Sequence, residues 1–250
     1  MFDSYIAIGD SFTEGLGDWT APDAPRGWAD RLAQALKESA GDSFLYANLA
    51  IRGRKLLPLL EEQLPEAIAQ RPALVSINGG GNDMLRPGFD VEENLHLLFE
   101  GVEKATESGA HVLLLAGPDP SDNLPLGPVF HSRGEAFTEA SVELANGFES
   151  VTFVDNFSDT GFRDTTYWSQ DGLHLSPAGH LRVAANCADA LGIPYPSFWP
   201  DPRNPEANPK QYGSPAYFKE YILPWVGRRL TGRSSGDGRV AKRPYLAPLT

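Results

Sequence analysis

Short apolar runs alternate with longer amphipathic segments along this chain, and the two kinds of segment differ in period. The short runs are nearly continuous in apolar character, as in HVLLLAG at residues 111–117. Such runs are typical of strands that are covered on both faces of a sheet. They predict strands near Ser4–Gly9, Phe44–Ala50, Ala73–Asn78, His111–Ala116 and Val151–Asp155.

The longer segments carry apolar residues at helical spacing, as in LRVAANCADAL at residues 181–191. That segment also has a start signal, because Ser176 is a good N-cap and Pro177 suits the first helical position. The alternation of strands and helices indicates an α/β fold, with a parallel sheet, right-handed crossovers and helices on both faces. We predict helices near Trp28–Ser39, Lys55–Ala69, Val91–Ser108, Glu135–Glu149 and Pro177–Leu191.

Two proline-rich segments stand outside this pattern. Residues 117–134, GPDPSDNLPLGPVFHSRG, are predicted to form a long loop, and loops of this length often border a functional site. From Ile193 onward the chain is again rich in proline, with a short helix expected within AYFKEYILPWVGRRL. We therefore expect one domain over residues 1–192 and a C-terminal extension over residues 193–250 that packs on it and whose last part could be mobile.

The composition is that of an ordinary globular protein, with 41% hydrophobic and 22% charged residues in 250. No apolar run approaches the roughly 18 residues of a transmembrane helix. The N-terminus, MFDSYIAIGD, lacks the basic region of a secretory signal. Cys187 is the only cysteine, so an internal disulfide and a cysteine-based metal cluster are excluded. We expect a buried thiol there and a cytoplasmic protein.

The charge balance argues against polyanionic partners. The net charge is −12, from 21 basic and 33 acidic residues. Like-charge repulsion opposes binding to nucleic acid or to an anionic membrane, and stable membrane insertion is not expected either. The stretch from Arg228 to Thr250 differs, because it carries six basic residues against Asp237. It could dock on the acidic body, join subunits or stay disordered.

Polar clusters follow the predicted strands at the edge where ligands bind in open parallel sheets. GDSFTEG (9–15) follows the first strand and NLAIRGRKL (48–56) closes the second. GGGND (79–83) follows the third strand, and DGLHLSP (171–177) lies in the connection after the fifth. Four such clusters at one edge suggest a site.

Ser11, Asp171 and His174 have the chemistry of a nucleophile with its base. A hydroxyl becomes a good nucleophile when a base takes its proton, and His174 would supply that base. Asp171, three residues earlier, could accept the Nδ1–H of His174 and leave Nε2 facing Ser11. The alternatives are a serine in a turn or N-cap and an exposed histidine before a helix. No H-x-x-x-H or H-E-x-x-H pattern occurs, so neither a metal nor a cofactor is expected.

An oxyanion that forms at this site needs preorganised hydrogen-bond donors. Asn82 could offer its side-chain amide after three glycines that allow close approach of the backbone. Gly53 and Ser11 could offer their N–H groups. The alternatives are a flexible turn at GGGND and a glycine at residue 53 that ends a strand. Asp83 is expected to support neighbouring loops.

The four clusters resemble the sequence blocks of the SGNH (GDSL-type) hydrolases, in the family's order, from about residue 4 to residue 192. The matching residues are GDS at 9–11, the glycine of NLAIRG at 53, GGND at 80–83 and DGLH at 171–174. The resemblance implies a flavodoxin-like three-layer α/β/α fold with five parallel strands. It also implies that Ser11 is the nucleophile, that Asp171 and His174 complete the triad, and that Ser11, Gly53 and Asn82 form the oxyanion hole. GDSFT replaces the common GDSLT or GDSIT, which keeps the apolar character.

The expected function is hydrolysis of carboxylic esters or thioesters of small to medium acyl groups through an acyl-enzyme. Within the family, a carbohydrate O-deacetylase or a lysophospholipase is the alternative. A nucleotide-binding module is disfavoured because Asp10 and Glu14 would repel phosphate, and a non-catalytic interaction domain is disfavoured because no block residue is missing. Arg52, Arg54 and Lys55 could meet an anionic substrate or be solvated charges. Candidate acyl contacts are Phe12, Leu16, Trp19, Met84, Leu85 and Trp168.

Overall fold

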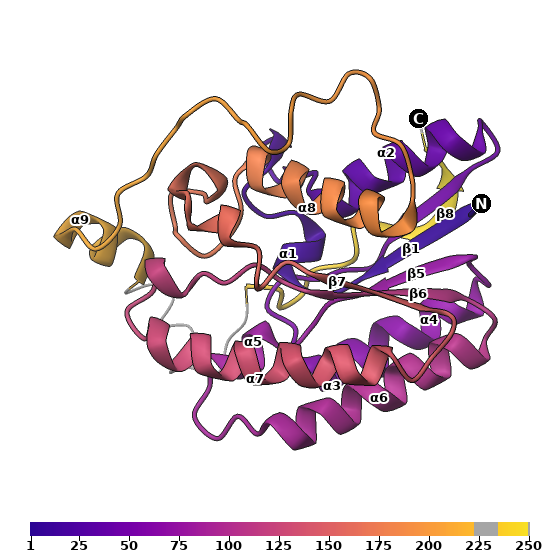
Figure 1. Cartoon of the computed structure of the whole chain (residues 1–250), viewed down its shortest axis with the longest axis horizontal. Helices are drawn as coiled ribbons and strands as arrows, with labels where there is room; N and C mark the ends of the chain where they lie inside the picture. The colour runs from indigo at the N-terminus through magenta and orange to yellow at the C-terminus, as the bar shows by residue number, and fades with distance from the viewer. Residues whose placement is uncertain (223–234, 250) are drawn as a thin grey trace.

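A six-stranded sheet forms the centre of the protein in a computed structural model that describes residues 1–222 and 235–249 (Figure 1). The strand order is β7-β6-β5-β1-β4-β8. Strand β1 pairs with both β4 and β5, so it is an inner strand, and the segment that follows it begins in the middle of the sheet edge. The parallel strands are β1 (Ser4–Ile8), β4 (Leu45–Asn48), β5 (Leu74–Ile77), β6 (His111–Ala116) and β7 (Val151–Asp155).

Helices cover both faces of the sheet, as Figure 1 shows. On one face α2 (Trp28–Ala40) packs against α8 (Pro177–Leu191). On the other face lie α6 (Val91–Glu107), α7 (Gly127–Ala145) and the helical segment from Leu56 to Ala69. This three-layer α/β/α arrangement is the predicted one.

Several shorter elements complete the described chain. The segment after β4 divides into α3 (Leu56–Pro58), a π-helical turn (Leu59–Gln63) and α4 (Leu64–Ala69). A small antiparallel hairpin consists of β2 (Trp19–Ala21) and β3 (Ala24–Pro25). The remaining helical pieces are α1 (Ser11–Glu14), α5 (Gly81–Met84), α9 (Pro215–Tyr217), a π-helical turn (Phe218–Ile222) and 3₁₀ turns at Ser121–Asn123, Thr160–Arg163 and Thr165–Tyr167.

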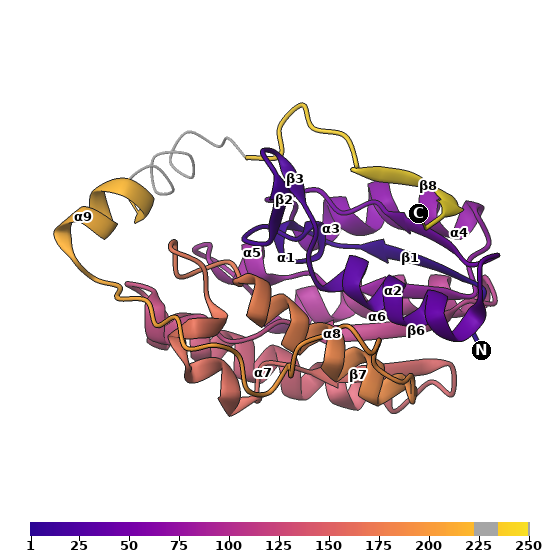
Figure 2. The same ribbon diagram turned by 90° about the horizontal axis from the view of Figure 1, so that it is seen from above.

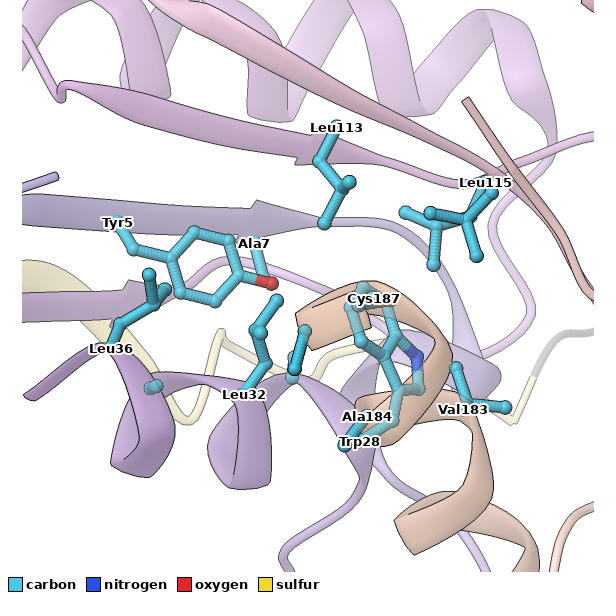
Figure 3. Close-up of a cluster of buried hydrophobic side chains, with 14 of the residues drawn as sticks. Tyr5, Ala7, Trp28, Leu32, Leu36, Leu113, Leu115, Val183, Ala184 and Cys187 are labelled. Carbon is cyan, nitrogen blue, oxygen red and sulfur yellow. The ribbon is translucent and has the colours of Figure 1, made fainter. Parts of the chain in front are cut away.

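The core beneath α2 and α8 is dense and largely apolar (Figure 3). Trp28 and Leu32 of α2 and Cys187 of α8 pack toward Tyr5 of β1 and Leu113 of β6, all fully buried. Burial raises the pKa of the Cys187 thiol, so the predicted buried cysteine is confirmed. This core holds the strands whose carboxyl ends carry the polar clusters.

The predicted strands and helices are largely confirmed, with one clear error in the loop at 117–134. Helix α7 begins at Gly127, well before the predicted start at Glu135. Pro128 does not interrupt the helix, because it lies in the first turn, where the N–H that proline lacks would have no intrahelical acceptor. Gly134, which suggested a loop, faces Phe157 so closely that a Cβ would lie 2.3 Å from the ring.

A sixth strand, β8 (Arg243–Pro248), was not predicted. It pairs antiparallel with β4, from Leu45↔Pro248 to Asn48↔Arg243. Pro244 and Pro248 argue against a central strand, but an edge strand can accommodate proline because its outer side needs no hydrogen bonds. The chain therefore places its C-terminal residues along one edge of the sheet (Figure 2).

The extension contacts the rest of the protein at both of its described parts. Tyr212 Oη donates to the Ser169 carbonyl at 2.8 Å, and Tyr217 Oη donates to the Asp171 carbonyl at 2.9 Å. The division at residue 192 stays a prediction. Of the expected helix within residues 216–230, only the part up to residue 222 is described, and Arg228, Arg229 and Arg233 also lie outside the described residues. No helix in the described part has the length and apolar character needed to cross a membrane.

Candidate active site

Ser11 stands at the start of α1, directly after the central strand β1. Its neighbour Asp10 is the N-cap of this helix, with its carboxylate accepting from the Phe12 N–H at 3.0 Å. Gly9 is required here because a Cβ would lie 2.3 Å from Thr13 Oγ1. Gly15 ends the helix in the left-handed conformation, with φ of 100°. The GDSFTEG motif therefore encodes a one-turn helix that presents Ser11 at the sheet edge.

The structure brings Ser11, His174 and Asp171 into one chain of hydrogen bonds. His174 Nε2 lies 3.0 Å from Ser11 Oγ, and His174 Nδ1 lies 2.6 Å from Asp171 Oδ2. The other carboxylate oxygen of Asp171 accepts from Ser169 Oγ at 2.7 Å and from the N–H groups of Leu173 and His174 at 3.0 and 2.9 Å. These bonds hold the carboxylate and the imidazole in a fixed orientation.

The electrostatics of the pair fit a proton acceptor backed by a carboxylate. Burial alone would raise the pKa of Asp171, but the charge of His174 and its hydrogen bonds outweigh burial and lower the pKa. Burial would likewise lower the pKa of His174, but the charge and hydrogen bond of Asp171 outweigh it and raise the pKa. The imidazole is thus a stronger base than an isolated histidine.

Asn82 lies beside Asp10, on α5 after β5. Its Nδ2 donates to Asp10 Oδ2 at 2.8 Å and to the Arg54 carbonyl at 3.1 Å. Asp83 supports a neighbouring loop as expected, because its carboxylate accepts from the Leu56 N–H at 2.9 Å. The structure therefore links the GGND and NLAIRG segments directly to the loop that carries Ser11.

Gly53 lies in the loop after β4, in the left-handed conformation with φ of 77°. Within residues 1–222 and 235–249, its N–H has no hydrogen-bond acceptor. The N–H of Ser11 begins α1 and so has no intrahelical acceptor. Both groups are donors that a substrate could use, although Gly53 does not line the cavity beside Ser11.

Sequence reasoning missed the ion pair that holds the Gly53 loop. Glu14 Oε2 accepts from the Arg52 N–H at 2.7 Å, and the Arg52 guanidinium donates to both carboxylate oxygens. Both residues are buried, so the interpretation of Arg52 as a solvated charge is wrong. Arg54, by contrast, forms a partly exposed pair with Glu62 at 2.9 Å. No local pattern signals the Glu14–Arg52 contact, because it depends on β1 and β4 being neighbours.

An apolar cavity of about 130 Å³ opens beside Ser11 and His174. Four of the six predicted acyl contacts line it, namely Phe12, Met84, Leu85 and Trp168, whereas Leu16 and Trp19 do not. The cavity lining also includes Phe130, Phe137, Thr138 and Ser141 of α7 and Pro118 and Pro120 before it. The proline-rich segment thus borders the site, as expected.

No metal-binding arrangement accompanies these residues. In the part of the chain that the structure describes, no group of three or more His, Cys, Asp or Glu side chains is placed to hold a metal ion. The groups that the structure places at the site are a hydroxyl, an imidazole, carboxylates and N–H donors.

Comparisons with known proteins agree with this geometry. The model of the GDSL-like Lipase/Acylhydrolase family matches residues 7–182, whereas no curated protein sequence matches. Among solved structures, TesA has a TM-score of 0.60 and 28% identity over 75% of this chain and 97% of its own. The esterase EstA from Pseudoalteromonas sp. has a TM-score of 0.60 and 19% identity, covering 76% of this chain and 97% of its own.

The acetylxylan esterase Axe2 from Geobacillus stearothermophilus has the same fold, with a TM-score of 0.60 and 19% identity over 78% of this chain and 97% of its own. The family match extends over well more than half of the chain and includes all four polar clusters. The chain therefore belongs to the GDSL-like lipase/acylhydrolase family, and it is a serine ester hydrolase of that family.

Proposed function

We propose that this enzyme hydrolyses carboxylic esters of short to medium acyl groups through an acyl-enzyme on Ser11. The observation that carries the proposal is the continuous hydrogen-bonded chain from Asp171 through His174 to Ser11, which ends at an apolar cavity. A nucleophile, its base and an adjacent apolar cavity are the parts that acyl transfer requires.

In the first half of the reaction, Ser11 Oγ attacks the ester carbonyl while His174 Nε2 accepts its proton. The tetrahedral intermediate collapses when His174 returns that proton to the leaving alcohol. In the second half, His174 takes a proton from water, the hydroxide attacks the acyl-serine, and the acid leaves as Ser11 is reprotonated. Asp171 holds the imidazole and stabilises its charged form throughout.

The oxyanion would be held by the N–H groups of Ser11 and Gly53 and by the Asn82 amide. Asn82 already donates to Asp10 and to the neutral Arg54 carbonyl. An oxyanion is a charged acceptor, so it forms a stronger hydrogen bond than a carbonyl and can replace Arg54 as the partner of one N–H. Asp10 would keep the other N–H and so preserve the orientation of the amide.

The cavity argues for the size of the acyl group. A dry apolar cavity of about 150 Å³ accommodates benzene, so about 130 Å³ suits a chain of roughly four to six carbon atoms. Phe130, Phe137 and Trp168 are among the side chains that make the lining apolar. We infer acyl groups up to this length as the preferred substrates. Cytoplasmic location stays a prediction from the single cysteine.

Fluorophosphonate labelling followed by intact-mass spectrometry tests the nucleophile. We expect one adduct, mapped to Ser11. The Ser11→Ala variant should show neither the adduct nor ester hydrolysis. Ser121→Ala is the matched control, because Ser121 Oγ donates to Asp119 Oδ2 at 2.8 Å and the neighbouring His131 Nδ1 contacts that same carboxylate oxygen at 2.6 Å rather than the serine. A folded parent protein without an adduct between pH 6 and 9 would contradict the proposal.

A substrate panel then separates the alternatives within the family. It contains p-nitrophenyl esters with two to twelve acyl carbons, an acyl thioester, an acetylated xylo-oligosaccharide and a lysophospholipid. We expect the highest kcat/KM for the esters with about four to six acyl carbons. A maximum for the acetylated sugar or for the lysophospholipid would replace the proposed substrate class while leaving the role of Ser11 unchanged.

A further inference from the structure

Lys242, near the C-terminus, inserts its ammonium group into a cluster of acceptors beneath the nucleophile helix. Lys242 Nζ lies 2.6 Å from the Glu14 carbonyl, 3.0 Å from the Pro25 carbonyl and 2.8 Å from the Arg26 carbonyl. It also lies 2.6 Å from Asp30 Oδ2. The side chains of Lys242 and Asp30 are 19% and 21% exposed, so water screens this pair only in part.

These acceptors lie on three parts of the chain: the end of α1, the end of β3 with its connection to α2, and the first turn of α2. The Glu14 carbonyl is at the end of α1, where a helix leaves its carbonyls without intrahelical donors. Pro25 is the last residue of β3, Arg26 lies in the connection to α2, and Asp30 lies in the first turn of α2. One ammonium group therefore ties α1, which begins with Ser11, to α2, which is anchored in the core.

The same helix end controls the loop that carries Gly53. The backbone of Glu14 is held by Lys242, while its carboxylate holds the N–H and the guanidinium of Arg52. The C-terminal segment also contacts this loop directly, because a Cβ on Gly236 would lie 2.1 Å from the Arg52 carbonyl oxygen. A displacement of Glu14 would thus move the residue that precedes Gly53.

We propose that Lys242 is a positioning residue that sets the distance between the Ser11 helix and the Gly53 loop. The inference rests on the proposed function, because those two elements supply the nucleophile and two oxyanion donors. β8 brings Lys242 to this position, since pairing of Arg243 with Asn48 starts at the very next residue. Arg243 Nε adds a hydrogen bond to the Tyr46 carbonyl of β4 at 2.8 Å.

The charge of Lys242 is needed as well as its length. A methionine at this position would fill similar space but would leave three carbonyls and the Asp30 carboxylate without their donor. The carbonyls would turn toward water or other donors, and Glu14 would move with its own. Because catalysis is sensitive to displacements of about 1 Å, such movement lowers turnover more than binding.

The test compares Lys242→Met with Arg239→Met, a substitution in the same segment. Arg239 pairs with Asp23 at 3.1 Å in an exposed contact, and Asp23 lies in the turn between β2 and β3 rather than in α1 or the Gly53 loop. Two measurements are made on each folded variant: kcat and KM for the best ester, and amide hydrogen exchange at residues 10–16 and 50–54 without substrate.

For Lys242→Met we expect kcat to fall about 10- to 100-fold, with KM changed less than about twofold. We expect exchange at Gly15, Leu16 and Arg52 to accelerate at least about tenfold, while Arg239→Met behaves as the parent. Parent-like kcat and exchange in Lys242→Met would overturn the inference. A lower melting temperature with unchanged kcat well below it would overturn it too, because Lys242 would then be only a stabilising residue.

Two further arms keep the result decisive. If Lys242→Met does not fold, Lys242→Gln is measured in the same way, because it retains N–H donors but loses the charge and one bond of the side chain's length. If the parent hydrolyses no ester but the Lys242 variant still accelerates exchange in both segments, the proposed function fails and the positioning role is supported. If the parent hydrolyses esters and the Lys242 variants match it in kcat and in hydrogen exchange, the proposed function is supported and the positioning role fails.

Discussion

At the scale of single residues, the histidines show how contacts decide chemistry. At His174, burial alone would lower the pKa of the imidazole, but the charge and the hydrogen bond of Asp171 raise it. His180 is fully buried, whereas the His174 side chain is 19% exposed. The ring nitrogens of His180 contact backbone groups: Nδ1 accepts from the Trp28 N–H at 3.2 Å and Nε2 lies 2.9 Å from the Leu16 carbonyl. Burial lowers the pKa of His180 to about 4, so it is neutral at pH 7. The same residue type thus has a raised pKa at one position and forms a structural link at another.

Asp171→Asn tests the origin of the raised pKa of His174. The base must be neutral, so kcat/KM of the parent should fall as the pH drops through a pKa above 6.5. Without the carboxylate, burial dominates and that limb should move to lower pH, while kcat at pH 8 falls on the order of 10³- to 10⁴-fold. Asp119→Asn, which removes the partner of His131, should leave the limb in place. An unmoved limb in Asp171→Asn would show that another group controls the profile.

At the scale of elements, α7 contributes a wall of the cavity beside Ser11. One face of this helix presents Phe130, Phe137, Thr138 and Ser141 to the cavity, while Ala136 is exposed. The hydroxyl of Ser141 donates to the Phe137 carbonyl of the same helix at 2.7 Å. Replacement of Ser141 therefore leaves no buried side-chain donor unpaired.

Ser141→Leu should shorten the cavity and shift the preferred acyl length. We expect kcat/KM for a hexanoyl ester to fall about tenfold relative to the acetyl ester, because one or two methylene groups in an apolar pocket are worth about 1–3 kcal/mol. Ala136→Leu, on the exposed face of α7, is the matched control and should keep the parent's preference. If the ratio of kcat/KM for the hexanoyl ester to kcat/KM for the acetyl ester is the same in the parent and in both variants, the acyl chain does not occupy this cavity.

At the scale of the whole molecule, several buried ionisable groups make stability depend on pH in opposite directions. Burial raises the pKa of Asp10 and of Asp30 to about 6, so their unfavourable ionisation is relieved as the pH falls below 6. His180 acts in the opposite sense. Its pKa of about 4 means that the unfolded chain binds a proton between pH 6.5 and 4 that the folded chain does not bind, so stability is lost as the pH falls.

The difference between the parent and His180→Gln isolates the histidine. From pH 7 to pH 4 the parent should lose about 3 kcal/mol of unfolding free energy more than the variant does. Urea unfolding at several pH values between these limits measures this difference, and the two carboxylates cancel from it. If the unfolding free energy changes with pH by the same amount in the parent and in His180→Gln, His180 binds a proton in the folded protein as readily as in the unfolded chain.

Much of the fold could be predicted because its signals are local. The five parallel strands appear as apolar runs, and four helices have a clear period, so their positions were predicted closely. The start of α7 and the strand β8 were missed, because proline and glycine at Pro128, Gly134 and Pro244 have meanings that depend on the neighbours they contact. The sequence of one segment does not show that it will lie at the edge of a sheet, as β8 does, or that an aromatic ring from elsewhere will pack against its glycine, as Phe157 does against Gly134.

The sequence by itself determined the α/β architecture and the candidate site residues that the structure brings together, because Ser11, Asn82, Asp171 and His174 occur in short motifs in the connections after strands. Only the tertiary structure decided how these residues are held. The Glu14–Arg52 pair joins residues 38 apart, and the contact of Lys242 with Glu14 joins residues 228 apart. Such contacts depend on which strands become neighbours, and that is settled by packing of the whole sheet rather than by any local pattern.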